Sequence, residues 1–208
     1  MKKNIIKTAL VLLAGLSFAS CDLTEPMQVQ ADKAMIFGTE SGLKTYSWSF
    51  YKMLPNIEDS FLQENGKVDY FVVRKMNNFF IDGAYTAETS TSWSWGNLRN
   101  VNYFLDGLKS KECTVDAKTV AHYEGLARWF RALFYFDKLT TYGEVPWFDK
   151  ELQNYEFDLM YKDRDSRDVI VKNIIADLDF AYENIQTTSS TGSSLVSKWA
   201  AAGLKSRV

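Results

Sequence analysis

The chain has 208 residues, a formal net charge of −2, a hydrophobic share of 46% and only 3 prolines. This composition excludes a disordered or collagen-like chain, because it supplies ample apolar material for a core. The nearly balanced charge offers no basic field for phosphates, so nucleic acid is not an expected partner. Aromatic residues make up 15% of the chain, with 6 Trp, 11 Tyr and 14 Phe. This share is high, and these residues must lie in a core or form a binding surface.

The first 21 residues have the pattern of a bacterial export signal. Three lysines lie within the first seven residues, and an apolar run over residues 8–19 follows. That run is shorter than the roughly 20 residues that a spanning helix needs. It ends in Phe18-Ala19-Ser20-Cys21, which resembles a lipobox, the motif in which the cysteine becomes lipidated.

We therefore predict a lipoprotein signal peptide over residues 1–20, lipid (palmitate) on Cys21, and a lipidated tether over residues 21–34. Acyl chains contribute about 0.8 kcal/mol per buried CH₂, so two or three of them anchor a protein stably without a spanning helix. The alternative is ordinary signal cleavage after Ala19 or Ser20, with an incidental cysteine.

From residue 39 onward, the three- and four-residue apolar spacing predicts a mainly α-helical protein. A first helix should end at Pro55, with an apolar face of Leu43, Tyr46, Phe50 and Leu54. A second is predicted over about residues 93–108, with Asn102 two turns from Trp95 on its apolar side. Between residues 57 and 92 the pattern is irregular, and only residues 68–73 have the pattern of a strand.

Two further helices have clear start signals. Asp116 is placed to cap a long third helix that ends at Gly143, and Ser166 to cap a fourth. The apolar stripe of the third is Val120, Tyr123, Ala127, Phe130 and Phe134. The inner face of the fourth is Ile170, Ile174, Leu178, Ala181 and Ile185.

A fifth helix should begin near Leu195, after a Ser/Thr/Gly-rich linker over residues 187–194. Its apolar positions stay in helical register up to Val208. We therefore expect the chain to be a fragment, truncated at its C-terminus. The alternative is a natural C-terminal helix that frays.

Three segments occur in the order and with the spacing of one protein family. The first is Glu124–Phe136 with Tyr142–Pro146, the second Arg164–Ser166 with residues 174–178, and the third Ser197–Val208. Together they resemble SusD/RagB-like proteins over about residues 15–208. Residues 35–208 would then be the N-terminal helical region of a family whose members are typically longer.

The resemblance implies a fold of tetratricopeptide-like helix pairs that support an irregular, loop-rich ligand face. It also implies a surface-exposed lipoprotein of the outer membrane that captures oligosaccharides or other nutrients. Such proteins deliver their ligand to a SusC-like TonB-dependent transporter, perform no chemistry and carry no cofactor.

Sugar recognition needs flat apolar faces flanked by hydrogen-bonding groups. Trp93, Trp95 and Asn97 offer this mixture at the start of the second helix. Residues two apart on a helix diverge, so the two tryptophans are not expected to share a face. Trp95 belongs to the apolar stripe and favours the core, whereas Trp93 is the better ligand candidate. Asn97 could bind a hydroxyl group, cap the helix or face solvent.

Other conspicuous residues favour structural roles. Arg128 and Arg131 should form surface or interhelical ion pairs, one of them between Glu124 and Arg128. The loop residues Trp147 and Phe148 should dock on the core, the alternative being a transporter-facing surface. The mixed-charge run over residues 158–168 predicts a solvated surface rather than a calcium loop.

Signals for catalysis are few. The only histidine, His122, has no partner at metal-ligand spacing, Cys113 is expected to be a buried inert thiol, and no nucleophile or phosphate-loop motif is present. We expect neither an enzyme nor a metal site. Two alternatives stay open: a surface lipoprotein glycoside hydrolase with paired carboxylates, and a helical-repeat module that binds only proteins.

Overall fold

The computed structural model describes residues 32–56, 81–84, 86, 92–186 and 195–208. Apart from Asp32, they belong to one compact unit, Lys33–Val208. In these ranges the chain forms helices and an isolated antiparallel bridge between Val145 and Asp165, with no strand. The predicted mainly α fold class is therefore confirmed. The proposed strand over residues 68–73 and the proposed lipid site at Cys21 lie outside the described residues.

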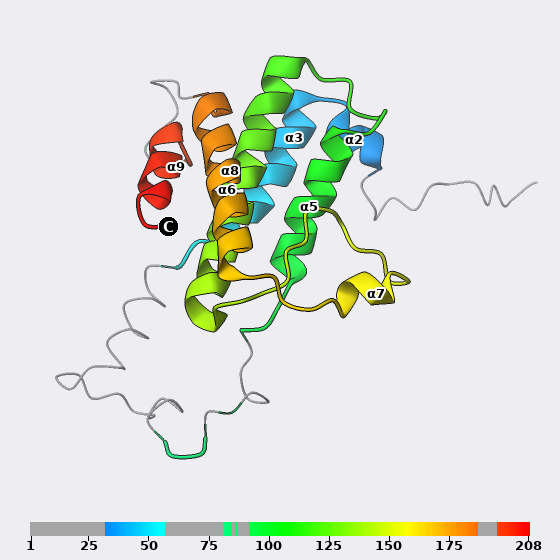
Figure 1. The fold of residues 1–208 in the computed structure, drawn as a ribbon. Helices are drawn as coiled ribbons and strands as arrows, with labels where there is room; N and C mark the ends of the chain where they lie inside the picture. Colours follow the sequence, from blue (N-terminus) through cyan, green and yellow to red (C-terminus); the bar gives the residue numbers. More distant parts are fainter. Residues whose placement is uncertain (1–31, 57–80, 85, 87–91, 187–194) are drawn as a thin grey trace, which may run out of the picture. The chain divides into compact units, whose positions relative to one another are not determined.

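Figure 1 shows how the helices of this unit pack. Helix α6 is in contact with α8, α5 and α3, and α9 packs on α8. None of the helices in the described ranges is long and apolar enough to cross a membrane. The helices are α2 (Lys33–Phe37), α3 (Glu40–Ser47), η2 (Trp48–Met53, a 3₁₀ helix), α5 (Gly96–Leu108), α6 (Ala117–Tyr142), α7 (Phe157–Met160), α8 (Arg167–Asn184) and α9 (Lys198–Lys205).

Helix α2 lies ahead of the first predicted helix and was not anticipated from the sequence. Its residues Ile36 and Phe37 are buried. The Phe37 ring packs against Gly107 of α5, where an added Cβ would lie within 2.4 Å of three ring atoms. A glycine at that position therefore allows α2 and α5 to approach closely.

The first predicted helix is present as α3 followed directly by η2. Thr39 caps α3 by accepting a hydrogen bond from the amide of Gly42 at 3.1 Å. Of the predicted apolar face, Leu43 and Phe50 are buried, but Leu54 is exposed. Leu54 was wrongly placed on that face because η2 ends at Met53 and the backbone of Leu54 is extended.

The long helix α6 has the predicted ends. The Asp116 carboxylate accepts hydrogen bonds from the amides of Lys118 and Thr119, at 3.1 and 3.0 Å. Gly143 ends the helix with a φ of 77°, in the left-handed region that favours glycine. The predicted stripe is buried except for Val120, which is half-buried.

Helix α8 packs along α6 with the predicted inner face, all five residues of which are buried. Ser166 occupies the predicted N-cap position, but its side chain makes no capping hydrogen bond. A buried ion pair joins the two helices: Nε and Nη2 of Arg131 donate to the two carboxylate oxygens of Asp177, each at 2.7 Å. The predicted pair within α6 is also present, since Nη2 of Arg128 lies 2.6 Å from Oε1 of Glu124.

Helix α9 is shorter than predicted. It begins at Lys198, three residues after the expected start, and ends at Lys205 instead of continuing to Val208. Its residues Ala201 and Leu204 are buried. This helix therefore adds apolar contacts to the outer side of α8.

Candidate ligand groove

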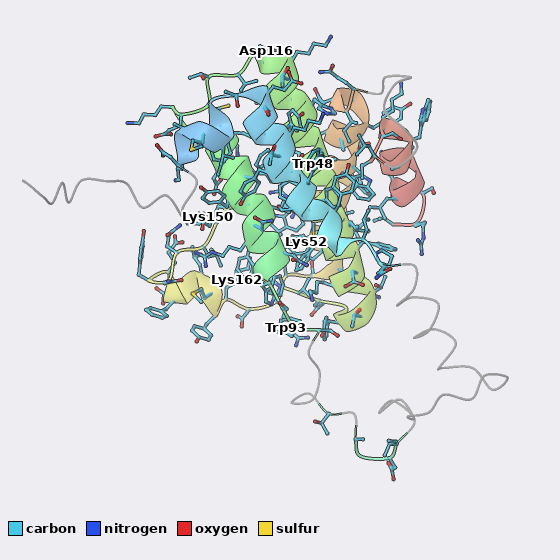
Figure 2. All side chains as sticks on the ribbon, turned by 180° about the vertical axis from the view of Figure 1, so that it is seen from behind. Trp48, Lys52, Trp93, Asp116, Lys150 and Lys162 are labelled. Carbon is cyan, nitrogen blue, oxygen red and sulfur yellow. The ribbon has the colours of Figure 1, made fainter. Side chains whose placement is uncertain are left out.

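A groove of about 520 Å³ lies between the N-terminal end of α5 and the segment that connects α6 to α8. In Figure 2, Trp93 and Lys162 lie near that end of α5, with Lys150 beside the same helix. The groove is thus built from two segments about 50 residues apart in the sequence. Its lining is Trp93, Trp95, Gly96, Leu98, Arg99, Asn102, Pro146, Phe148, Lys150, Leu152, Asn154, Met160, Tyr161, Lys162 and Arg164.

The two candidate tryptophans both line this groove. Helix α5 begins at Gly96, so Trp93 and Trp95 precede the helix. The rule that residues two apart on a helix point to different sides therefore does not apply to them. Their ring centroids lie 5.2 Å apart in an edge-to-face contact, and the prediction that the two could not share a face is wrong. Trp95 packs on the core through Phe134 and Phe148, whereas the side chain of Trp93 is 41% exposed.

A buried lysine holds the backbone that carries these tryptophans. The Nζ of Lys138 in α6 donates a hydrogen bond to the carbonyl oxygen of Ser92. The same ammonium group lies 5.1 Å from the ring centroid of Phe134 and 5.7 Å from that of Tyr142. Sequence reasoning missed this residue, because a lysine in a long helix is ordinarily solvated.

The opposite wall of the groove is the segment over residues 146–164, and Tyr135 attaches this segment to α6. Its hydroxyl oxygen accepts a hydrogen bond from the amide of Phe148 at 2.6 Å, and its ring stacks on Trp147 with the centroids 4.1 Å apart. Burial raises the pKa of the Tyr135 phenol, so it stays neutral. The prediction that Trp147 and Phe148 dock on the core is confirmed.

Two polar residues of α5 hold the same wall from the other side. The buried amide nitrogen of Asn102 donates hydrogen bonds to the carbonyl oxygens of Phe148 and Lys150, both at 3.0 Å. One turn further, the carboxylate of Asp106 accepts from the amide of Glu151 at 2.8 Å. An asparagine on an otherwise apolar helix face was the signal in the sequence that could have identified this anchor.

The end of the wall is closed by Asp165. Its amide donates to the carbonyl oxygen of Val145 at 3.0 Å, and its carboxylate accepts from the amide of Trp147 at 2.6 Å and pairs with Lys162 at 2.7 Å. Burial acts to raise the pKa of Asp165, but the hydrogen bonds from Lys162 and Trp147 outweigh it and lower that pKa. The charge run over residues 158–168 is exposed, as predicted, except for Lys162 and Asp165, which are half-buried.

The remaining candidate residues lie outside the groove. Asn97 is exposed in the first turn of α5 and is not part of the lining, and its binding role stays a prediction. The Nδ1 of His122 accepts a hydrogen bond from the amide of Gln186 at 3.0 Å, a structural contact. Cys113 is half-buried rather than buried. No cluster of potential metal ligands occurs among the residues that the structure describes.

The groove thus combines aromatic surfaces with hydrogen-bond donors. The ring of Trp93 lies beside Arg164, and that of Phe148 beside Lys162, with cation-to-centroid distances of 5.2 and 5.5 Å. Tyr161, 82% exposed, lies at its rim. Apolar ring faces can cover the C–H surfaces of a sugar while donors bind its hydroxyl oxygens.

Residues 43–208 match the sequence model of a SusD-like family that is described as "Starch-binding associating with outer membrane". The chain therefore belongs to the SusD-like family. Among solved structures it is similar to a SusD-like protein from Bacteroides fragilis, with a TM-score of 0.69 and 23% sequence identity. The match covers 85% of this chain and 36% of that protein, so the chain spans about a third of its length. No curated protein matches this sequence.

Proposed function

We propose that this chain captures oligosaccharides, or chemically similar nutrients, in the groove between α5 and the segment over residues 146–164. The observation that carries the proposal is the partly exposed ring of Trp93, which lines the groove beside Trp95. The family description, which names starch binding and the outer membrane, supports the same ligand class. An exposed aromatic ring in a groove also favours a small ligand over a module that binds only proteins.

Binding measurements on the purified whole chain, in a non-ionic detergent, test this proposal. Calorimetric titration with malto-, xylo- and galacturono-oligosaccharides should give binding to at least one, and Trp93→Ala should weaken it about tenfold through the lost ring contact. Trp199→Ala is the matched control, because Trp199 is exposed on α9 and lies outside the groove lining. Equal binding by wild type and Trp93→Ala would contradict the proposal.

The same samples test the hydrolase alternative. The proposed function is binding without chemistry, so chromatography of the ligand after prolonged incubation should return it unchanged. Release of shorter sugars, abolished by substituting a carboxylate of this chain, would replace the proposal with a glycoside hydrolase.

We further propose that the chain is a lipid-anchored, surface-exposed outer-membrane protein that passes its ligand to a SusC-like TonB-dependent transporter. The lipobox-like sequence before Cys21 and the outer-membrane association of the family support this location. In cells fed labelled palmitate, the wild-type chain should become labelled and should be recovered in the outer-membrane fraction. The Cys21→Ser variant should lose both the label and the membrane association. Label retained by Cys21→Ser, or wild-type protein recovered from the cytosol, would contradict the anchor.

A further inference from the structure

The charge of the groove points to a narrower ligand class than the family description gives. Four of its lining residues are cationic: Arg99, Lys150, Lys162 and Arg164. None of the described lining residues is an aspartate or a glutamate. All the charged side chains of the lining are therefore positive, in a chain whose formal net charge is −2.

Three of the four cations are held by carboxylates that do not belong to the lining. Glu151 lies 3.3 Å from Arg99, Glu156 lies 2.5 Å from Lys150, and Asp165 lies 2.7 Å from Lys162, each measured between nitrogen and oxygen. Each pair brings a carboxylate beside the ammonium or guanidinium group. They also neutralise much of the charge of these three cations, so the pairs alone would not select an anion.

Arg164 differs from the other three. Within the described part of the chain it has no carboxylate partner, and its guanidinium carbon lies 5.2 Å from the centroid of the Trp93 ring. The guanidinium group carries five N–H donors in a planar fork that matches a carboxylate or a sulfate in a bidentate arrangement. A sugar on the Trp93 ring would place its substituents beside this guanidinium group, which pairs with no carboxylate among the described residues.

We propose that the groove selects an acidic oligosaccharide, and that Arg164 binds the carboxylate or sulfate of the sugar that contacts Trp93. This inference rests on the proposed binding function and specifies its ligand class. A neutral oligosaccharide would use the same ring and donors but would bring no anionic group to the Arg164 guanidinium. Selectivity should therefore reside in Arg164, whereas Trp93 contributes to the affinity for both kinds of sugar.

The test uses two matched pairs of probes with the whole chain in a non-ionic detergent. The carboxylate pair is a galacturonic acid tetramer and its fully methyl-esterified form. The sulfate pair is a sulfated galactan oligosaccharide and its chemically desulfated form. In at least one pair the charged form should bind about tenfold more tightly at 50 mM salt, and the pair that shows the preference identifies the anion. Raising the salt to 500 mM should reduce that preference by screening.

Variants separate contact in the groove from a general effect of charge. Arg164→Gln should lose the preference for the charged probe and keep binding to the neutral one. Arg167→Gln removes the same charge three residues away, from an exposed position outside the lining, and should keep the preference.

Other outcomes would overturn the inference. A wild-type chain that binds charged and neutral probes equally, with Trp93→Ala still weakening both, would overturn the acidic preference and leave the proposed function intact. A preference that survives in Arg164→Gln would overturn the role of Arg164. Failure to bind any carbohydrate, charged or neutral, would overturn the proposed function together with this inference.

Discussion

Arg131 is a buried residue of α6 that contacts both α8 and the loop after α6. Its guanidinium group forms the buried pair with Asp177 and also donates to the carbonyl oxygen of Asp149, at 3.3 Å. It lies 5.3 Å from the ring centroid of Trp147. One side chain therefore links α6 to α8 and to the loop that forms the groove wall.

Removing one partner of this pair should be strongly destabilising. Asp177→Ala leaves the Arg131 charge buried without its carboxylate, and we expect the free energy of unfolding to fall by about 3–5 kcal/mol. Replacing both partners, as Arg131→Met with Asp177→Leu, removes both charges and should recover most of that loss. Urea unfolding followed by far-ultraviolet circular dichroism measures both changes. If Asp177→Ala were as stable as wild type, the Arg131–Asp177 pair would contribute little to stability.

At the scale of elements, the groove depends on how the segment after α6 is attached. Side chains from α6 and α5 bind its backbone through Tyr135, Asn102 and Asp106. The segment has little regular structure of its own, so these hydrogen bonds hold its main chain in place. Helices far apart in the sequence thus position the residues of the groove wall.

The contact between the start of α6 and the end of α8 should depend on pH. Burial lowers the pKa of His122 below its usual 6.5, and the charge of Glu40 opposes this only in part. The folded chain therefore binds this proton less readily than the unfolded chain, so stability should fall as the pH drops below about 6.5. The slope that one proton can contribute is at most about 1.4 kcal/mol per pH unit.

A non-titrating variant isolates this contribution. His122→Asn retains a side-chain acceptor for the amide of Gln186 but carries no proton that titrates in this range. Urea unfolding at pH 7.5 and 5.5 should show a larger loss of stability for wild type than for His122→Asn. Identical losses in the two proteins would assign the pH dependence to other groups.

At the scale of the whole molecule, the sequence predicted the helices better than the groove. Apolar periodicity and caps identified the inner faces of α6 and α8, because a buried helix face repeats every three to four residues. Helix α2 escaped prediction because its five residues are too few to show a period. Its burial depends on a glycine about 70 residues away, Gly107, which no local pattern reveals.

The groove could be predicted only in part, for a related reason. Trp93 and Trp95 were recognisable as candidates by residue type, but the start of α5 was misplaced, and with it the relation between their rings. Lys138, Tyr135 and Asp165 act through contacts between segments 13 to 46 positions apart. Their residue types are common, so only the fold shows what they hold.

The way the groove wall is fastened has a consequence for how its selectivity can be altered. The main-chain groups of Phe148 and Lys150 are held by helix side chains, whereas Leu152, Asn154 and Tyr161 line the groove outside those attachment points. We expect exchanges at these three positions to alter the surface that faces a ligand without removing the hydrogen bonds that attach the segment to the helices. The same helical scaffold could thus acquire a different ligand specificity through a few substitutions on a single connecting segment.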